Sequence, residues 1–440
     1  MAFDWELYNV IVVGVAFLSV FTAWQTSNQY QVLVLKDILN ANNLGFDSMA
    51  LTYILACISN FIATPIVLRF GPKICMIVGS SAYALFFLNM LFPTIVGVYT
   101  TSAGVGIGSA ILWCAQGNFL TLNSNDQTRG RNSGLFTSIF QGSLLVGSFL
   151  AYSILPNTDG DSENTLKSIF HQFYFILMIA SMAGVLIFFF LRSPPIFYSR
   201  DGIVQEYEKP HTSSVSSIIQ NIMSAIKLAK QRNFLFLVVL MVYTGVSHVF
   251  WGSKYPTMVG GVLIPGPDVV FPSIFNARSI GLQGIFLGLG AVAGGLSMGK
   301  AADRRGCTFI VVVGFVFHAA AYYVIYANFL GVPWYNMILA VACSFMLGFG
   351  DSAITTALVI QLQELFPGSS IQSFAMCKLC QGFGRFVALL YSPYLILEIN
   401  LLINGVFLTV GVIMFIHLDF PNYYAKQTYA GYKPIRSSDD

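Results

Sequence analysis

Long apolar runs separated by short polar segments dominate the pattern along this chain. Each run continues for about 20 residues, the length that a helix needs to cross the hydrocarbon core of a bilayer. The strands of membrane barrels alternate polar and apolar residues instead. The pattern predicts an all-α polytopic membrane protein with twelve transmembrane helices at 8–28, 47–68, 73–92, 95–122, 131–155, 169–191, 234–253, 279–299, 307–329, 334–360, 370–394 and 398–417.

Composition agrees with this prediction. Charged residues make up 9% of the 440 residues and hydrophobic residues 56%, whereas a soluble domain carries about 25% charged residues. The seven cysteines lie in or beside apolar runs, so no disulfide framework is predicted. The N-terminal segment MAFDWELYN is acidic. It lacks the basic region of a signal peptide, so we expect the first apolar run to be a retained helix.

Basic residues gather on one side of the predicted spans. Cytoplasmic loops carry an excess of Lys and Arg, so this asymmetry predicts that both termini are cytosolic. The inner side would hold sixteen basic residues: Arg69, Lys73, Arg129, Arg131, Arg192, Arg200, Lys209, Lys227, Lys230, Arg232, Lys300, Arg304, Arg305, Lys426, Lys433 and Arg436. The outer loops would hold four: Lys36, Lys167, Lys254 and Arg278.

The longest inner segment, 192–233, divides the chain into six-helix halves at 1–191 and 234–417, with a cytosolic tail at 418–440. The end of this segment, SVSSIIQNIMSAIKLAKQRN, has apolar residues on one helical face and basic residues at its C-terminal end. It predicts an amphipathic helix on the inner membrane surface. A solvated linker is the alternative.

The two halves resemble each other. Gly106-Ile-Gly108 in the fourth span is echoed by Gly348-Phe-Gly350 in the tenth, and Gln141-Gly142 downstream is echoed by Gln381-Gly382. Weak parallel similarity between six-helix halves is typical of the major facilitator superfamily. We therefore expect that fold, with two pseudo-symmetric halves.

A loop motif supports the repeat. The segment from Gly299 through Asp303 and Arg304 to Gly306 resembles the superfamily's cytoplasmic G-x-x-x-D-R-x-G motif. In the first half only Arg69 and Gly71 of the motif survive, with Leu68 where its Asp would stand. The resemblance implies a charge latch on one end-state, which the missing Asp weakens. A tight inner loop that only follows the positive-inside rule is the alternative.

Amides within apolar surroundings are candidate cavity residues. Polar side chains in a membrane face the bundle interior. Gln116 and Asn123 share a helical face, and with Gln25 they could line a central cavity. Gln141 and Gln381 are further candidates. Hydrogen bonding between helices without any ligand is the alternative.

A family resemblance rests on LWCAQGNFLTLNS followed by GRNSGLF, on GVAFLSVFTAWQT at 14–26, and on LGFGDSAITTALV at 347–359. These stretches resemble the Unc-93-like family of the major facilitator superfamily, the ion-channel regulatory "uncoordinated" family, and most closely its orphan solute-carrier-like branch. The resemblance extends over nearly the whole chain. It implies twelve helices and a role as a channel-associated regulator or as an escort for membrane receptors.

Charges inside the predicted spans occur in the second half. Ionisable residues there are costly and are functional candidates. Asp351 in the tenth span and Lys378 in the eleventh lie at similar depth, so we expect an ion pair. Arg385 shares a face with Lys378 and Gln381. The group predicts either an anion- or proton-sensitive site, or a structural ion pair with one snorkelling arginine.

Other chemistry is not indicated. The five histidines show no metal-ligand spacing, so neither a metal nor a cofactor is predicted. The sequence has no catalytic constellation and no nucleic-acid motif, which argues against an enzyme. Tyr432-Lys-Pro-Ile435 in the tail has the form of a sorting signal, which leaves the plasma membrane and endosomal or lysosomal membranes as alternatives.

The sequence favours one function, and a second is kept as its alternative. The degraded loop motif and the lack of carboxylates in the first, fourth and seventh spans favour a regulator or trafficking partner of a channel or receptor. The polar residues on facing helices favour the second function, a secondary transporter or uniporter of a small solute. The expected partners are the bilayer, a membrane channel or receptor, and a small solute.

Overall fold

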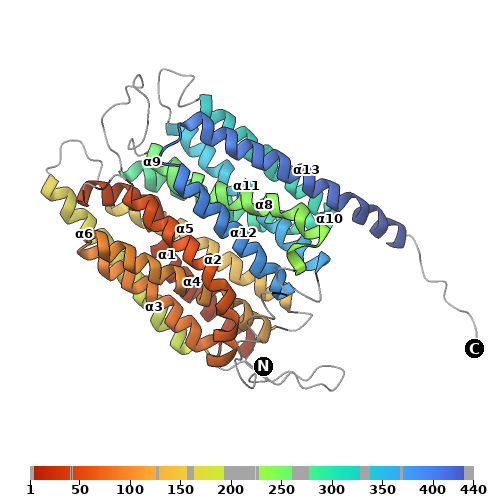
Figure 1. Cartoon of the computed structure of the whole chain (residues 1–440), viewed down its shortest axis with the longest axis horizontal. Coiled ribbons are helices and arrows are strands. Elements are labelled where there is room, and N and C mark those ends of the chain that lie inside the picture. The colour runs from red at the N-terminus through yellow and green to blue at the C-terminus, as the bar shows by residue number, and fades with distance from the viewer. Residues whose placement is uncertain are drawn as a thin grey trace, which may run out of the picture.

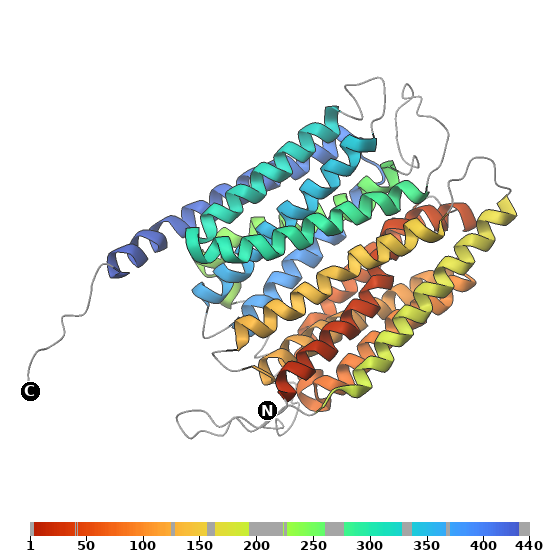
Figure 2. The same ribbon diagram turned by 180° about the vertical axis from the view of Figure 1, so that it is seen from behind.

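The computed structural model describes residues 4–39, 41, 43–124, 128–155, 163–192, 223, 227–259, 277–327, 337–366 and 370–430, and nearly all of them are helical. Two groups of helices lie side by side, from α1 to α6 and from α8 to α13 (Figures 1 and 2). The first group is formed by α1 (Trp5–Leu39), α2 (Leu44–Phe70), α3 (Pro72–Leu91), α4 (Ile95–Leu122), α5 (Arg129–Ile154), α6 (Glu163–Ile187) and η1 (Phe188–Phe190). The second is formed by α8 (Arg232–Val249), η2 (Phe250–Lys254), α9 (Tyr255–Val259), α10 (Ala277–Tyr326), α11 (Met337–Leu365), α12 (Ser370–Tyr391) and α13 (Leu397–Ala430).

Eleven helical segments of the described residues are long and apolar enough to cross a membrane. The α10 helix supplies two of them, Arg278–Gly299 and Arg304–Tyr326, and its backbone is non-helical at Gly306. The α12 helix is not among them, and it carries Lys378, Arg385 and several amides and hydroxyls. The predicted number of twelve therefore stays a prediction, although a helix occupies each of the twelve predicted ranges.

Two predicted ends are wrong. The first helix continues from 28 to Leu39, and the seventh continues from 253 to Val259 through the π-helical segment η2. The last predicted span, 398–417, agrees within one residue with the membrane-length segment Leu397–Leu418, and its helix continues through Ala430. The predicted boundary between the halves lies in or beside 193–222, outside the described residues.

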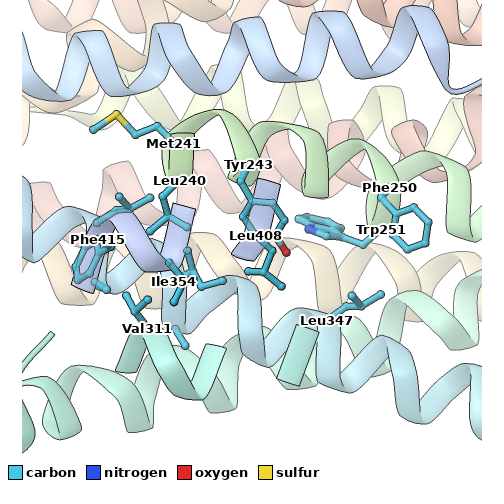
Figure 3. Close-up of a cluster of buried hydrophobic side chains, with 14 of the residues drawn as sticks. Leu240, Met241, Tyr243, Phe250, Trp251, Val311, Leu347, Ile354, Leu408 and Phe415 are labelled. Carbon is cyan, nitrogen blue, oxygen red and sulfur yellow. The ribbon is translucent and has the colours of Figure 1, made fainter. Parts of the chain in front are cut away.

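Each group of helices has its own apolar core. One buried cluster is built almost entirely from α1 to α6, and includes Phe17, Phe86 and Tyr174. The other is built almost entirely from α8 to α13, and Figure 3 shows part of it, with Tyr243 and Trp251 among Leu347, Leu408 and other apolar side chains. Burial of such side chains against one another supports two separately packed halves.

Glycine contacts reproduce the internal repeat. In α4, a Cβ at Gly106 would press on Thr52 of α2, and one at Gly108 on Gly79 of α3. In α11, a Cβ at Gly348 would meet Leu287 in the first part of α10, and one at Gly350 would meet Gly314 and His318 in the second part. The fourth helix of each half thus packs through glycines on the second and third helices of its own half. Small residues at these sites let the backbones approach.

The halves meet along two helix pairs, α5 with α10 and α2 with α12. We call the end of the bundle that carries Arg69, Lys73, Arg192 and Arg304 the basic end. Toward the other end, α10 and α5 approach closely, since a Cβ at Gly281 would meet the backbone of Tyr152 and one at Gly288 the backbone of Leu145. Toward the basic end, a Cβ at Gly295 or Gly299 would meet nothing within 4 Å.

A third apolar cluster joins the halves at the end opposite the basic end. It includes Phe46, Met49 and Ala50 of α2, Val246 and Val249 of α8, and Ala388 and Leu389 of α12. All seven side chains are at most 3% exposed. In this structure the halves are therefore sealed together at the end away from the basic residues.

Lys254 corrects one part of the charge analysis. The sequence placed it in an outer loop, but it ends η2 and is 1% exposed. Its Nζ donates to the carbonyl oxygens of Ser392, at 2.7 Å, and Leu395, at 3.3 Å, beyond the end of α12. A lysine in the last turn of one helix thus satisfies carbonyls that follow the end of another.

Candidate functional site between the two halves

The predicted polar face of α12 forms a ladder of hydrogen bonds with α8. Gln381 Nε2 donates to Thr244 Oγ1 at 3.1 Å, and one turn later Arg385 Nη2 donates to His248 Nδ1 at 3.2 Å. Lys378 Nζ donates to Gln381 Oε1 at 3.2 Å. The spacing of three and seven residues therefore does bring these three side chains onto one face.

The same face touches the other half. Lys378 Nζ lies 5.6 Å from the centre of the Trp113 ring of α4, and the Arg385 guanidinium lies 5.2 Å from that of Tyr53 of α2. Cys57 Sγ donates to the carbonyl oxygen of Leu379 at 3.6 Å. Cations attract the faces of aromatic rings, so both α12 cations bridge the two halves.

Asp351 does not form the predicted ion pair with Lys378 at bonding distance. Among the described residues, no carboxylate oxygen lies within 4 Å of Lys378 Nζ or of the Arg385 nitrogens, and Arg385 Nε has no hydrogen-bond partner. The groups that act electrostatically on the Asp351 carboxylate are Arg385, the Trp251 indole and then Lys378. The similar depth of Asp351 and Lys378 in their spans correctly predicted that they lie in one region, but it did not predict which groups they contact.

The three candidate amides of the first half lie on different helices. Gln25 is on α1, Gln116 on α4 and Gln141 on α5, and none of them makes a hydrogen bond with another described residue. The same helices meet in an aromatic layer where the rings of Phe17, Phe21, Trp113, Phe136 and Phe140 pack at centroid distances of 5.1–6.4 Å. These amides remain candidates for contact with a ligand.

Asn123 has a different role from the one predicted. It is fully buried, and its Oδ1 accepts from Asn9 Nδ2 of α1 at 2.7 Å. Asn132 of α5, also buried, donates to the carbonyl of Asn123 at 2.9 Å and to Ser124 Oγ at 3.0 Å. Polar residues of this stretch therefore join α1, α4 and α5 at the basic end.

The loop motif is present in both halves as a backbone turn. Gly306 has φ 83° and ψ 170°, and Gly71 has φ 82° and ψ 154°. Arg69 and Arg304 are exposed. Gly299 lies within the helical part of α10, and a Cβ there would meet nothing within 4 Å. The side chain of Asp303 is outside the described set, so the charge latch stays a prediction.

Two further predictions also fall outside the described residues. These are the sorting signal at Tyr432 and Ile435, and most of the amphipathic segment, of which only Met223 and 227–233 are described. In the described part of the chain, no group of three or more His, Cys, Asp or Glu side chains could hold a metal ion.

Sequence reasoning missed the partners that α8 supplies. Thr244, His248 and Trp251 recur at spacings of four and three within an otherwise apolar span, which was an available signal for a polar helix face. The His248 and Trp251 rings lie 4.2 Å apart. Trp251 falls in η2, and π-helical turns are frequent at functional sites. The facing residues Trp113 and Tyr53 carried no such signal.

Comparison with known proteins gives a family match and several relatives. Residues 39–416 match the family described as "Ion channel regulatory protein UNC-93". The chain is 32% identical over 441 residues to the "UNC93-like protein MFSD11" of Xenopus laevis, covering 94% of this chain and 96% of that one. It is 24% identical to the human "Protein unc-93 homolog A", covering 91% and 90%.

Two solved transporters share the fold of this chain. A POT family transporter in complex with 5-aminolevulinic acid aligns with a TM-score of 0.67 at 11% identity, covering 92% of this chain and 95% of that one. The nucleoside transporter NupG aligns with a TM-score of 0.64 at 11% identity, covering 93% and 99%. At this identity the similarity concerns the fold, and it agrees with the predicted major facilitator architecture.

Proposed function

This chain belongs to the UNC-93 family and has the fold of a major facilitator transporter, and from that premise we propose that it carries a small anionic solute across its membrane. The observation that supports the proposal most strongly is the pair of cations on α12. Lys378 and Arg385 both contact the first half, and neither has a carboxylate at ion-pairing distance among the described residues.

Charge balance indicates an anion. Unpaired ionisable groups within a membrane are costly and usually line a functional path. Around the ladder, two cations face one carboxylate, Asp351, and one histidine, His248. A small carboxylate or similar anion between Lys378 and Arg385 would balance the excess positive charge through charge-assisted hydrogen bonds.

The position of the cations fits alternating access. In transporters of this architecture the substrate lies near the midplane between two halves that rock around it. A ligand that Lys378 and Arg385 hold would contact α12 on one side and Trp113 or Tyr53 on the other. In this structure the halves are sealed through Ala50 and Ala388 at the end opposite the basic end, so transport requires that seal to open.

The first test is two-sided labelling of single cysteines. In a version of the chain without its seven native cysteines, Ala388→Cys reports the sealed end, Ser138→Cys on α5 reports the basic end, and Thr94→Cys in an exposed turn is the control. A membrane-impermeant maleimide applied to each side of sealed vesicles should label Ala388→Cys slowly from the side that labels Thr94→Cys. Complete protection of Ala388→Cys under all conditions would contradict transport.

The second test addresses the anion. Sodium acetate, benzoate and phosphate are the probes, and trimethylammonium chloride is the cation control. At least one anion should raise the apparent melting temperature of the purified protein and change the labelling rate of Ala388→Cys. Lys378→Met and Arg385→Met should abolish both effects, whereas Lys230→Met at the exposed basic end should keep them. If alternation occurs but no anion acts, the proposed solute class is wrong while transport stands.

A second candidate function, regulation of a channel or receptor, is supported by the description of the matched family. The match covers residues 39–416, which include every described helix from α2 to α12. A regulator would not need the sealed end to open. Protection of Ala388→Cys together with stoichiometric co-purification of a channel subunit would favour this function over transport.

A further inference from the structure

A chain of buried hydrogen bonds crosses the second half, away from the α12 cations. His318 of α10 lies at one end, and its Nδ1 bonds the Tyr243 hydroxyl of α8. The Tyr243 hydroxyl lies 3.0 Å from that of Tyr322, which in turn lies 3.3 Å from Asn404 Oδ1 of α13 and 3.3 Å from Ser247 Oγ. Figure 3 shows Tyr243 inside the apolar cluster.

The two ends of this chain have fixed roles. His318 Nε2 lies 2.9 Å from the carbonyl oxygen of Leu347, which can only accept, so Nε2 carries a proton. Asn404 Nδ2 donates to the carbonyl oxygen of Asn400 at 2.9 Å, so Oδ1 is the atom that faces Tyr322. At this contact Asn404 can therefore only accept a hydrogen bond from the Tyr322 hydroxyl.

With a neutral His318, this series of hydrogen bonds has one proton too few for its contacts. The His318 Nδ1 is then unprotonated and accepts a hydrogen bond from the Tyr243 hydroxyl. Tyr243 can bond Tyr322 only by accepting, so the single proton of Tyr322 is needed both for Tyr243 and for Asn404. With the Ser247 proton, three protons are available for four contacts. One pair of oxygens must face each other without a proton, which is costly in a buried site.

A protonated His318 satisfies every contact. Its Nδ1 then donates to Tyr243, Tyr243 donates to Tyr322, and Tyr322 donates to Asn404, while Ser247 donates to the second lone pair of Tyr322. We propose that His318, Tyr243, Tyr322 and Asn404 form a proton-binding site, because the observed geometry matches the hydrogen-bond pattern of the protonated chain. The ligand is a single proton held on the His318 imidazole.

A carboxylate acts on the two tyrosines of this site. The α11 backbone touches the imidazole, since a Cβ at Gly350 would lie 2.9 Å from His318 Nε2, and the next residue is Asp351. The Asp351 carboxylate acts electrostatically on both tyrosines. The described titratable groups around His318 are thus Tyr243 from α8, Tyr322 from α10 itself and Asp351 from α11. The α13 helix contributes the neutral amide of Asn404, which also donates to the backbone carbonyl oxygen of Asn400.

The proton site is connected to the α12 ladder. The Asp351 carboxylate also interacts electrostatically with Arg385 and Lys378. Tyr243 directly precedes Thr244, whose hydroxyl accepts the hydrogen bond of Gln381. A proton on His318, through Tyr243, and an anion at the cations, through Gln381 and Thr244, would therefore act on the same turn of α8. If the protein transports an anion, as proposed above, this coupling makes it a proton–anion symporter. The inference of symport rests on the proposed function, whereas the inference of proton binding does not.

Infrared titration of the full chain tests proton binding directly. The protein is labelled with [13C]histidine, placed in nanodiscs without any added solute, and titrated from pH 8 to pH 4. The wild type minus His318→Gln difference should contain the imidazolium signature of one histidine. Tyr322→Phe keeps the ring but removes the conflict over the hydroxyl proton, so a neutral His318 is then fully bonded. In that variant the protonation midpoint should fall by about one pH unit or more.

Tyr323→Phe is the matched control, because Tyr323 neighbours Tyr322 but is 73% exposed. It should leave the midpoint unchanged. The proposal is overturned if His318 shows no imidazolium signature between pH 8 and pH 4, or if Tyr322→Phe and the wild type share one midpoint. Because no solute is present, these outcomes are independent of cysteine labelling and of the anion tests. If His318→Gln does not fold, the Tyr322→Phe comparison still decides.

Discussion

Gly71 and Gly306 adopt the same backbone conformation at equivalent turns of the two halves, with φ 82° and 83°. With ψ of 154° and 170°, both lie in a region that only glycine adopts readily. Gly71 joins α2 to α3, and Gly306 joins the two parts of α10. The first-half motif has lost its Asp but has kept the residue that the turn requires.

Gly306→Ala should therefore destabilise the protein by about 1–3 kcal/mol, because a Cβ strains this backbone conformation. Gly299→Ala, in the same motif, is the control. Its Cβ would meet nothing within 4 Å, and alanine in a helix is favoured over glycine by about 1 kcal/mol. Apparent melting temperatures in detergent should fall for the first variant and hold or rise for the second. Equal values would show that the turn tolerates a side chain.

The motif placed a loop at both of these glycines, but their shared backbone conformation comes from the structure. The sequence also predicted the helices, since an apolar run of membrane length has few alternatives. The sequence-based prediction failed where the partner of a residue depends on the direction in which its side chain points. The π-helical segment η2 carries Lys254 inward rather than into a loop, and depth alone did not pair Asp351 with Lys378. The His318 chain joins residues 75–82 positions apart, so no local pattern indicates it.

Lys254→Met should lower the apparent melting temperature although it removes a buried charge. The ammonium is bonded to the carbonyls of Ser392 and Leu395, and its loss leaves both without that donor. Leaving buried acceptors unsatisfied costs about 1–3 kcal/mol. Lys230→Met, at an exposed lysine near the basic end, should have little effect. A similar change in both variants would mean that the Lys254 contacts contribute nothing.

Asn123→Leu should destabilise the basic end of the first half. The change removes the acceptor of Asn9 Nδ2 and buries a larger apolar group beside two amides. A loss of about 1–3 kcal/mol is expected from the unsatisfied partner. Asn118→Leu on the same helix is the control, since Asn118 makes no hydrogen bond with another described residue. Thermal unfolding of both variants measures the difference.

A double-mutant cycle on Asp351 and Lys378 measures how strongly they are coupled. The two groups act on each other electrostatically, but Lys378 bonds Gln381 instead. The stability losses of Asp351→Asn and Lys378→Met should therefore be nearly additive, with a coupling energy below about 1 kcal/mol. A bonded buried pair would give a coupling of several kcal/mol, because either single change would leave an uncompensated charge. That result would require a rearrangement of the α12 ladder.

The contact between α5 and α10 should control how readily the sealed end opens. A Cβ at Gly288 would lie 3.0 Å from the Leu145 backbone, so Gly288→Val forces the halves apart on the sealed side. We expect faster maleimide labelling of Ala388→Cys in that background. Gly295→Val lies two turns along the same helix, where a Cβ meets nothing within 4 Å, and should leave the rate unchanged. Because the expected change is an increase in reactivity on one side only, general unfolding is distinguishable by simultaneous labelling of the buried native Cys343, retained for this purpose. If Gly288→Val leaves Ala388→Cys protected while the protein stays folded, the seal does not depend on this helix pair, and the α2–α12 contact becomes the element that holds it closed.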